Sequence, residues 1–400
     1  MYYLGGSPME NTVGKIRFTK SQIWFLTAMG LVMGLRELSM TMLNPFISIY
    51  GETLTWSTPL LCGFALGVYG LTNAVFQIPY GSWSDRAGRK PVILTGLVQL
   101  AAGMFLAFLA RNIYMLIIAR ALQGCGAVMA IAYAWLGDGI EDDKKSSAMG
   151  IAGVMVALGA VIAFVAGPLL YRVVTVRYMF LGCAFLITLA FILILFCLKE
   201  QRQTRPNPAN IKFLSQMKSL LVQKPVRLLS ICGFIINYLN AELFMIVPTT
   251  LKRTIGTENM WMVFLPAILC GVLAMKLTTS LSDKGYYKQV SVLAFALMAL
   301  AWIVLVPGGL PFTVAGTIMS LTGFMCLTAG IPSEMNKLIC EENRGAANGI
   351  LQTMTFLGFF FGPTVAGLFI QIHIPFFLFG ISIVLAVVGA LAQNPFAAHN

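Results

Sequence analysis

Residues 81–90, GSWSDRAGRK, form a short polar segment between two long apolar runs. The segment holds four charges within six positions, whereas only 10% of the whole chain is charged. Such a density of charge belongs at a membrane surface and not in hydrocarbon. Gly81 and Gly88 permit close helix approach and a positive φ at the ends of the turn, and Asp85 stands where it can cap the following helix. We therefore expect a tight turn that clamps two helices together.

The composition is that of a membrane protein. Over 400 residues, 58% are apolar and the mean hydropathy is +0.82, values far outside the range of soluble globular domains. Twelve apolar runs reach the 18 residues needed to cross a bilayer. They cover about 22–49, 57–82, 91–110, 113–136, 148–170, 178–198, 228–250, 260–281, 289–307, 311–333, 346–370 and 375–393. The sequence thus predicts an all-α membrane protein with twelve transmembrane helices.

The net charge of +12 reflects topology and needs no nucleic-acid partner. With the N-terminus inside, nineteen Lys and Arg residues fall in the predicted cytoplasmic segments. Five fall in the predicted outer loops: Arg111, Arg172, Arg177, Lys252 and Arg253. Because cytoplasmic loops of membrane proteins carry the excess of basic residues, we expect both termini to be cytoplasmic. A polar start without a hydrophobic core also argues against a cleaved signal peptide.

The longest internal polar stretch, 199–227, divides six spans from six. We expect an N-terminal bundle at 1–198, a cytoplasmic linker at 199–227 and a C-terminal bundle at 228–400. Apolar residues at helical spacing between 213 and 221 indicate a short interfacial helix, with a disordered linker as the alternative. Segments 145–159 and 344–358 align without gaps, which indicates two pseudo-symmetric six-helix bundles of the kind that rock against each other in transporters.

Three motifs resemble those of the major facilitator superfamily. The turn fits GxxxDRxGRK through Gly81, Asp85, Arg86, Gly88, Arg89 and Lys90. The fourth span resembles lxxxRxxqGxga, with Arg120, Gly124 and Gly126. The eleventh span fits a glycine pattern through Gly349, Gly358, Gly362, Pro363 and Gly367, for which glycine-mediated helix packing is the alternative interpretation. Antiporters of the family carry that pattern on the fifth span, where this chain matches it only in part.

Ionisable groups inside the spans are informative because each costs about 2.5–3.5 kcal/mol at mid-bilayer. Arg36 and Glu37 lie near the middle of the first span, and Glu242 is the counterpart of Glu37 in the seventh. The resemblance places both carboxyl groups beside the substrate path and implicates Arg120 in proton coupling. We expect these four residues to couple protons to transport; the alternative is that Glu37 merely pairs with an arginine in packing. Lys276 is expected to snorkel to the interface.

Asp138 ends the fourth span, where the family places an acidic residue close to the charged turn. With Asp85, Arg86 and Arg89 it is expected to form a charge-assisted network that closes the cytoplasmic side. Only a network that breaks as a unit can act as such a latch, because single surface pairs contribute roughly 0–1 kcal/mol.

Tyr69, Asn73 and Gln77 share one face of the second span. Further polar and aromatic residues are expected to line a largely apolar cavity with them, although packing is the alternative for each tyrosine and tryptophan. They are Asn44, Tyr133, Trp135, Asn237, Tyr238, Asn240 and Gln352.

These features predict a monomeric secondary transporter of the cell membrane, similar to drug:proton antiporters, which exports an amphipathic or lipophilic small molecule. A proton symporter, an uncoupled facilitator, and a lipid flippase or membrane scaffold are the alternatives. No hydrolase or phosphate-loop motif occurs, so we expect neither an enzyme nor a cofactor. Eight singly spaced cysteines and two separate histidines predict no metal site.

Overall fold

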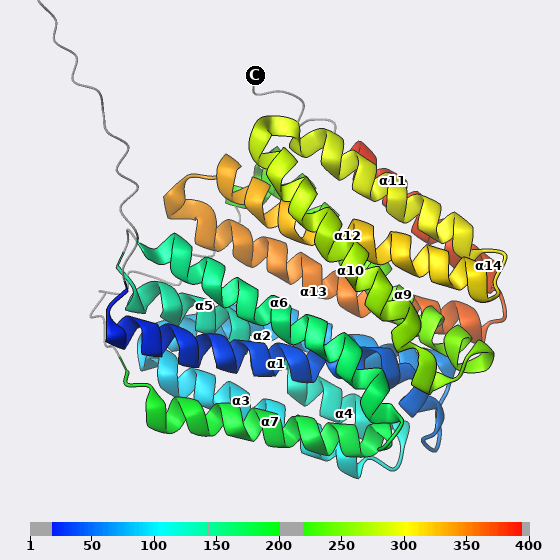
Figure 1. Ribbon diagram of the computed structural model, residues 1–400, viewed down its shortest axis with the longest axis horizontal. Helices are drawn as coiled ribbons and strands as arrows, with labels where there is room; N and C mark the ends of the chain where they lie inside the picture. Colours follow the sequence, from blue (N-terminus) through cyan, green and yellow to red (C-terminus); the bar gives the residue numbers. More distant parts are fainter. Residues whose placement is uncertain (1–17, 142–143, 201–218, 394–400) are drawn as a thin grey trace, which may run out of the picture.

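A computed structural model describes residues 18–141, 144–200 and 219–393, and these residues are almost entirely helical (Figure 1). The first half contains α1 (Lys20–Glu52), α2 (Pro59–Ala87), α3 (Arg89–Leu109), α4 (Ile113–Gly124), α5 (Val128–Gly139), α6 (Lys145–Tyr171) and α7 (Val176–Cys197). The second half contains α9 (Lys224–Thr254), α10 (Trp261–Leu281), α11 (Tyr287–Leu305), α12 (Leu310–Leu338), α13 (Glu341–Gln371) and α14 (Pro375–Leu391).

Within the described residues, these helices form twelve membrane-spanning segments. Helices α4 and α5 form one crossing that is interrupted at Ala127, which has a φ of 42°. The continuous apolar stretch Thr257–Leu305 holds both α10 and α11, which are separated by a turn at Gly285 with a φ of 92°. Helix α14 has 17 residues and is the shortest crossing helix. The predicted number of spans is confirmed.

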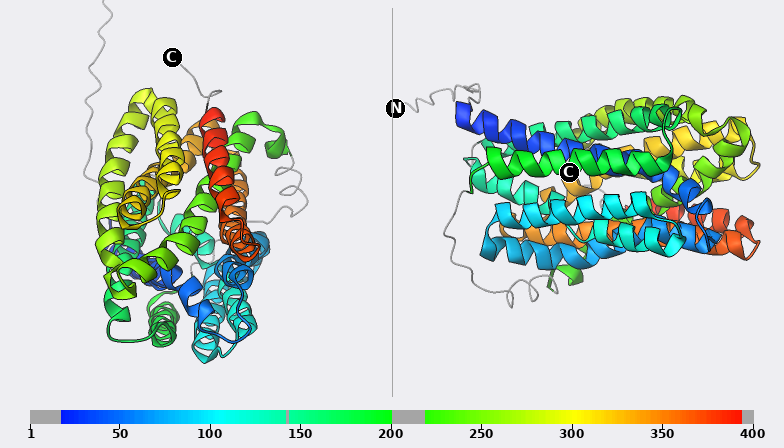
Figure 2. Two further views of the ribbon diagram at one scale, coloured as in Figure 1. Left: turned by 90° about the vertical axis from the view of Figure 1, so that its right-hand side faces the viewer. Right: turned by 90° about the horizontal axis from the view of Figure 1, so that it is seen from below.

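The helices gather into two bundles that follow the chain halves. Helix α1 packs against α6 and α7, and α3 against α4 and α7; in the second half α9 packs against α13, and α12 lies between α10 and α11. Figure 2 (left) shows the blue-to-green and the yellow-to-red helices as two neighbouring groups. Helix α1 begins and α14 ends on the same side of the molecule, here called the terminal side. The predicted two-bundle fold is confirmed, while the exact domain limits stay a prediction.

Helices α2 and α13 join the two bundles through direct backbone contact. A Cβ added at Gly67 would lie 2.5 Å from the carbonyl oxygen of Phe360, and one at Gly70 would lie 2.5 Å from that of Phe356. Small residues let membrane helices approach this closely, and their association then rests on van der Waals packing. The α2–α13 joint, defined by these glycines, therefore accepts no larger side chain without movement.

Most of the glycines expected to pack helices do so. A Cβ added at any of these positions would collide with a neighbouring helix: Gly124 against α2, Gly126 against α3, Gly358 and Gly362 against α9, and Gly367 against the start of α2. The carbonyl group of Pro363 likewise contacts Gly63 of α2. Gly349 differs, because nothing lies within 4 Å of an added Cβ. The packing role expected for Gly349 is therefore wrong for this conformation.

The bundles are closed at the side opposite the chain ends. There Lys252 of α9 and Glu52 of α1 form an ion pair of 3.1 Å, which links the two halves. The ring of Phe164 on α6 stacks on those of Phe244 and Phe264 in the C-terminal bundle, with centroids 5.9 and 6.1 Å away. Toward the terminal side, Gly81 of α2 faces open space, as does Gly349 of α13. Contacts between the two halves are thus established at the side opposite the chain ends.

The interfacial helix expected between residues 213 and 221 lies partly outside the described residues: 213–218 are not described, whereas 219–222 are helical. His399 also lies outside the described residues.

Two alanine substitutions on α13 test the glycine packing. Gly362→Ala places a methyl group against the backbone carbonyl of Tyr238, so we expect a loss of about 1–3 kcal/mol and a melting temperature several degrees lower. Gly349→Ala meets no atom within 4 Å and should leave stability unchanged or slightly raised. Thermal unfolding of both purified variants in detergent, followed by size-exclusion chromatography, measures the difference. Equal melting temperatures would contradict the packing described here.

Candidate functional site

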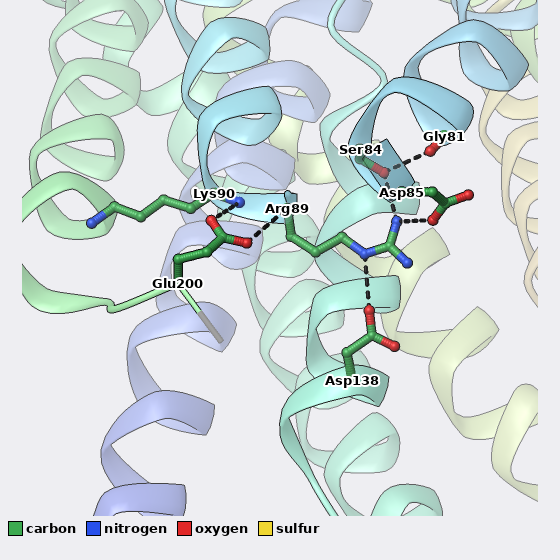
Figure 3. A network of polar contacts seen from close by, with 7 residues as sticks. All are labelled: Gly81, Ser84, Asp85, Arg89, Lys90, Asp138 and Glu200. Carbon is green, nitrogen blue, oxygen red and sulfur yellow. Dashed lines mark hydrogen bonds and ion pairs between the residues drawn. The ribbon is translucent and has the colours of Figure 1, made fainter. Parts of the chain in front are cut away.

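The charged turn between α2 and α3 builds a polar network inside the N-terminal bundle (Figure 3). The guanidinium group of Arg89 donates to Asp138 of α5 at 2.9 Å and to the hydroxyl of Ser84 at 2.6 Å, and it contacts Asp85 at 2.5 Å. Asp85 is half-exposed, whereas Arg89 and Asp138 are mostly buried. Charge-assisted hydrogen bonds of this kind are about twice as strong as neutral ones. Arg89 thus ties α2, α3 and α5 together at the terminal side.

A second set of contacts joins the start of α3 to the end of α7. The carboxylate of Glu200 accepts hydrogen bonds from the backbone amides of Arg89 and Lys90, both at 2.9 Å. The Lys90 ammonium group donates to the carbonyl oxygens of Leu195 and Leu198 at 2.9 and 2.6 Å. An anion therefore stands at one helix N-terminus and a cation at a helix C-terminus, where each is stabilised by the helix dipole.

Gly88 makes the Glu200 contact possible. Its φ is 97°, and a Cβ at this position would lie 2.8 Å from the carboxylate of Glu200. The positive φ expected at this position is confirmed. Three other expectations for the turn differ from the structure. Asp85 caps no helix and pairs with Arg89 instead. Gly81 makes no close helix contact, and Arg86 is exposed with no polar partner among the described residues.

The network keeps to the N-terminal half. Its partners come from α2, α3, α5 and Glu200, all in the first half of the chain. That the network closes the cytoplasmic side stays a prediction.

The corresponding turn of the C-terminal half carries a smaller polar network. Asp283, in the turn between α10 and α11, pairs with Lys337 of α12 at 3.2 Å. Lys337 stands seven residues before the repeat segment 344–358, as Asp138 stands seven residues before segment 145–159. The two positions carry opposite charges.

A cluster of charged and aromatic side chains occupies the middle of the N-terminal bundle. On α1, Arg36 donates to the carboxylate of Glu37 at 2.9 Å, and Thr41 donates to the other carboxylate oxygen at 2.9 Å. Arg36 also donates to the hydroxyl of Tyr69 on α2. Arg36 is buried with an exposed fraction of 8%, whereas the Glu37 side chain is 24% exposed. Glu37 is thus the more exposed member of the pair.

Arg120 of α4 lies near the ring of Tyr69 and is fully buried. It donates to Gln123 at 2.7 Å, approaches the carbonyl oxygens of Ala65 and Leu66 at 3.4 Å, and stands 5.1 Å from the centroid of the Tyr69 ring. No carboxylate of the described residues pairs with it. Arg36 also stands near the same ring, at 6.0 Å. Two guanidinium groups therefore lie near the Tyr69 ring, where cation–π attraction contributes about 0.5–2 kcal/mol each.

The ring of Tyr69 also contacts the other bundle. It meets Phe356 and Phe359 of α13 edge to face, with centroids 6.3 and 6.2 Å away. Tyr69 consequently links the charged cluster to the α2–α13 joint.

Glu242 lies inside the C-terminal bundle, fully buried. Both of its carboxyl oxygens contact the hydroxyl of Ser382 on α14, at 2.8 and 2.7 Å, and the same hydroxyl lies 2.9 Å from the carbonyl oxygen of Leu378. The hydroxyl has a single hydrogen, so these contacts are best satisfied when Glu242 carries a proton and donates one of them. Glu242 is thus fully buried in this conformation, whereas Glu37 is partly exposed.

The residues expected to line a cavity differ in how deeply they are buried. Tyr133 and Asn237 are half-buried, and Gln352 is exposed. Tyr69, Asn73, Tyr238 and Asn240 are buried. Asn44 and Gln77 are half-buried, and each has a side-chain oxygen without a hydrogen-bond partner among the described residues. Trp135 is fully buried against Phe25 at 5.7 Å, so it belongs to the core of its bundle and its expected place in the cavity is wrong.

The fold and the paired bundles define a polytopic membrane transporter of the two-bundle kind. Residues 29–335, and again 229–399, match the sequence pattern of the Major Facilitator Superfamily. The chain belongs to this family.

Three known proteins are similar to this chain in sequence or in fold. It is 31% identical to the inner membrane transport protein YajR of Escherichia coli K12 over 343 residues, which are 85% of this chain and 76% of the relative. It is 28% identical to the multidrug resistance protein MdtG of E. coli strain UMN026 over 203 residues, 48% of each chain. The crystal structure of a bacterial homolog of the human lysosomal transporter Spinster, inward-facing and unoccupied, covers 95% of this chain and 98% of its own with a TM-score of 0.74 and 15% identity.

Two arginines of the turn provide a matched test of the polar network. Arg89→Ala removes the contacts to Asp138 and Ser84, so we expect a loss of about 1.5–3 kcal/mol in stability. Arg86→Ala, three positions away and exposed, should change stability by less than about 0.5 kcal/mol. Detergent melting curves of the two variants give the comparison. A greater loss for Arg86→Ala would overturn the roles assigned to the two residues.

Proposed function

We propose that this family member is a proton-coupled antiporter that exports an amphipathic or lipophilic small molecule by alternating access. In this proposal the terminal side is cytoplasmic, both termini lie inside, and the protein works as a monomer in the cell membrane. The excess of Lys and Arg in the segments of that side supports the orientation. The chain limits 1–198, 199–227 and 228–400 then define the two moving bundles and the linker between them.

The conformation described here corresponds to an inward-open state. The α2–α13 joint, the Lys252–Glu52 pair and the stacked phenylalanines close the side opposite the termini, while Gly81 and Gly349 face open space. In the alternating-access mechanism the bundles rock about a central site, so the opposite state would open these contacts and close the terminal side.

The observation that carries the proposal is the ion pair between buried Arg36 and partly exposed Glu37. A proton that reaches Glu37 from solvent removes the negative charge that Arg36 faces. Arg36 and Arg120 then lie near Tyr69 without an ionised carboxylate as partner, and an unpaired buried charge costs several kcal/mol. The protonated state therefore favours a different arrangement of this cluster.

Tyr69 supplies the connection from protonation to bundle movement. It accepts a hydrogen bond from Arg36 and contacts Phe356 and Phe359 of α13 across the joint. A shift of Arg36 after protonation of Glu37 therefore acts on a side chain that holds the two bundles together. Proton binding and the rocking movement become coupled through one residue.

Export is supported by the relatives. MdtG is named as a multidrug resistance protein, and the match to it covers about half of each chain. The largely apolar interior with sparse polar atoms, such as those of Asn44 and Gln77, suits amphipathic molecules better than densely hydroxylated sugars.

Transport in proteoliposomes tests the coupling. A panel of lipophilic cations, organic acids and sugars first identifies a transported compound. Glu37→Gln preserves size and hydrogen bonding but takes up no proton, so it should retain counterflow exchange and lose accumulation driven by a pH gradient. Glu242→Gln, whose amide can still contact Ser382, tests the second carboxyl group in the same assay: loss of pH-driven transport would assign Glu242 to the coupling, and retention would leave Glu37 to carry it.

Three results would contradict the proposal. Undiminished pH-driven transport by Glu37→Gln would remove Glu37 from the coupling. Substrate movement in the same direction as protons would indicate a symporter, and transport indifferent to the gradient would indicate an uncoupled facilitator.

A further inference from the structure

An open surface depression of about 640 Å³, called the α10–α12 cavity below, lies between α10 and α12 near their terminal-side ends. Six of its lining residues come from α10 and the following turn, and Ala329 comes from α12. The lining combines Lys276, Lys284 and the hydroxyl-bearing Thr279 and Ser280 with an apolar wall at Met275 and Ala329. The cavity is separate from the cluster of charges around Tyr69, which belongs to the other bundle.

The sequence of α10 places this polar face beside an apolar one. Lys276, Ser280 and Lys284 recur every four residues and so share one side of the helix. The exposed leucines of α10 form a neighbouring stripe, which suits contact with lipid tails: Leu269, Leu273, Leu277 and Leu281. A molecule bound along this helix would therefore meet positive charge on one flank and hydrocarbon on the other.

The charge of the cavity is positive. Its one carboxylate, Asp283, is already paired with Lys337 at 3.2 Å. Lys276 and Lys284 are both exposed, and neither has an ion-pair partner among the described residues. Two ammonium groups are thus left to attract an anion in a region bordered by apolar surface.

Snorkelling accounts for only part of this arrangement. Lys276 precedes the end of α10 by five residues, about 7.5 Å along the helix, so its stem can carry the ammonium group toward the interface. A snorkelling lysine requires neither a cavity nor a second lysine. Here a hollow contains both lysines and two hydroxyl-bearing residues, and basic pockets between membrane helices on the cytoplasmic side suit anionic head groups.

We propose that the α10–α12 cavity binds an amphipathic anion, with its carboxylate or phosphate head on Lys276 and Lys284 and its tail against Met275, Ala329 and the leucine stripe. The anion has two possible sources, a bilayer lipid or a transported solute. The site does not depend on the proton coupling proposed above, because no residue is shared.

Binding of dodecyl phosphate to the purified full-length protein in a nonionic detergent tests the site. We expect a saturable rise in melting temperature for the unsubstituted protein, with inorganic phosphate far weaker because it lacks the tail. Lys276→Gln and Lys284→Gln should each weaken binding about tenfold, whereas Lys276→Arg should retain it. Lys224→Gln, an exposed lysine at the start of α9 outside the cavity, is the matched control and should bind normally.

Nanodiscs of phosphatidylcholine with and without phosphatidylglycerol separate the two sources. If phosphatidylglycerol displaces dodecyl phosphate, the occupant is a bilayer lipid; if it does not and proteoliposomes take up dodecyl phosphate, the occupant is a transported solute. Equal affinities in Lys276→Gln, Lys284→Gln and Lys224→Gln, or equal binding of inorganic phosphate, would overturn the proposal.

Discussion

The contact between the glycine-lined face of α2 and the backbone of α13 is the constraint on which the rest of the structure depends. In a bilayer, lipid tails are as apolar as the helices, so two bundles stay together only where their surfaces fit closely. Gly67 and Gly70 provide that fit by bringing backbone to backbone. The joint closes one side of the protein, leaves the other free to separate, and determines where Tyr69 stands between the halves.

Tyr69 in turn organises the buried charge. Two guanidinium groups share its ring, and one of them, Arg120, has no carboxylate partner among the described residues. A cluster with more positive than negative charge is stable only while its geometry is maintained, because each ionised group must find hydrogen bonds in a medium of low dielectric constant. The cluster is therefore sensitive to any change in the charge of Glu37, the more exposed member of the ion pair.

The sequence predicted the fold well and the site in part, for physical reasons. Twelve apolar runs and a duplicated segment suffice to indicate two six-helix bundles, since span length follows from bilayer thickness. Glu200 was missed because its contact with Arg89 joins residues 111 positions apart, and no local pattern signals such a cap. Asp85 was misassigned because Arg89, one helical turn away, offers a charged partner that competes with the helix terminus. Spacing identified Gly349 as a packing glycine but could not reveal which parts of α13 lie apart from other helices.

The two halves use different residues of their equivalent turns to pair with α5 and α12. Asp138 and Lys337 occupy equivalent places in the duplicated halves, yet the first meets Arg89 and the second meets Asp283. The N-terminal turn uses its arginine for this contact and the C-terminal turn its aspartate. The duplicated halves have therefore diverged in the residue pair that ties the turn to the neighbouring helix.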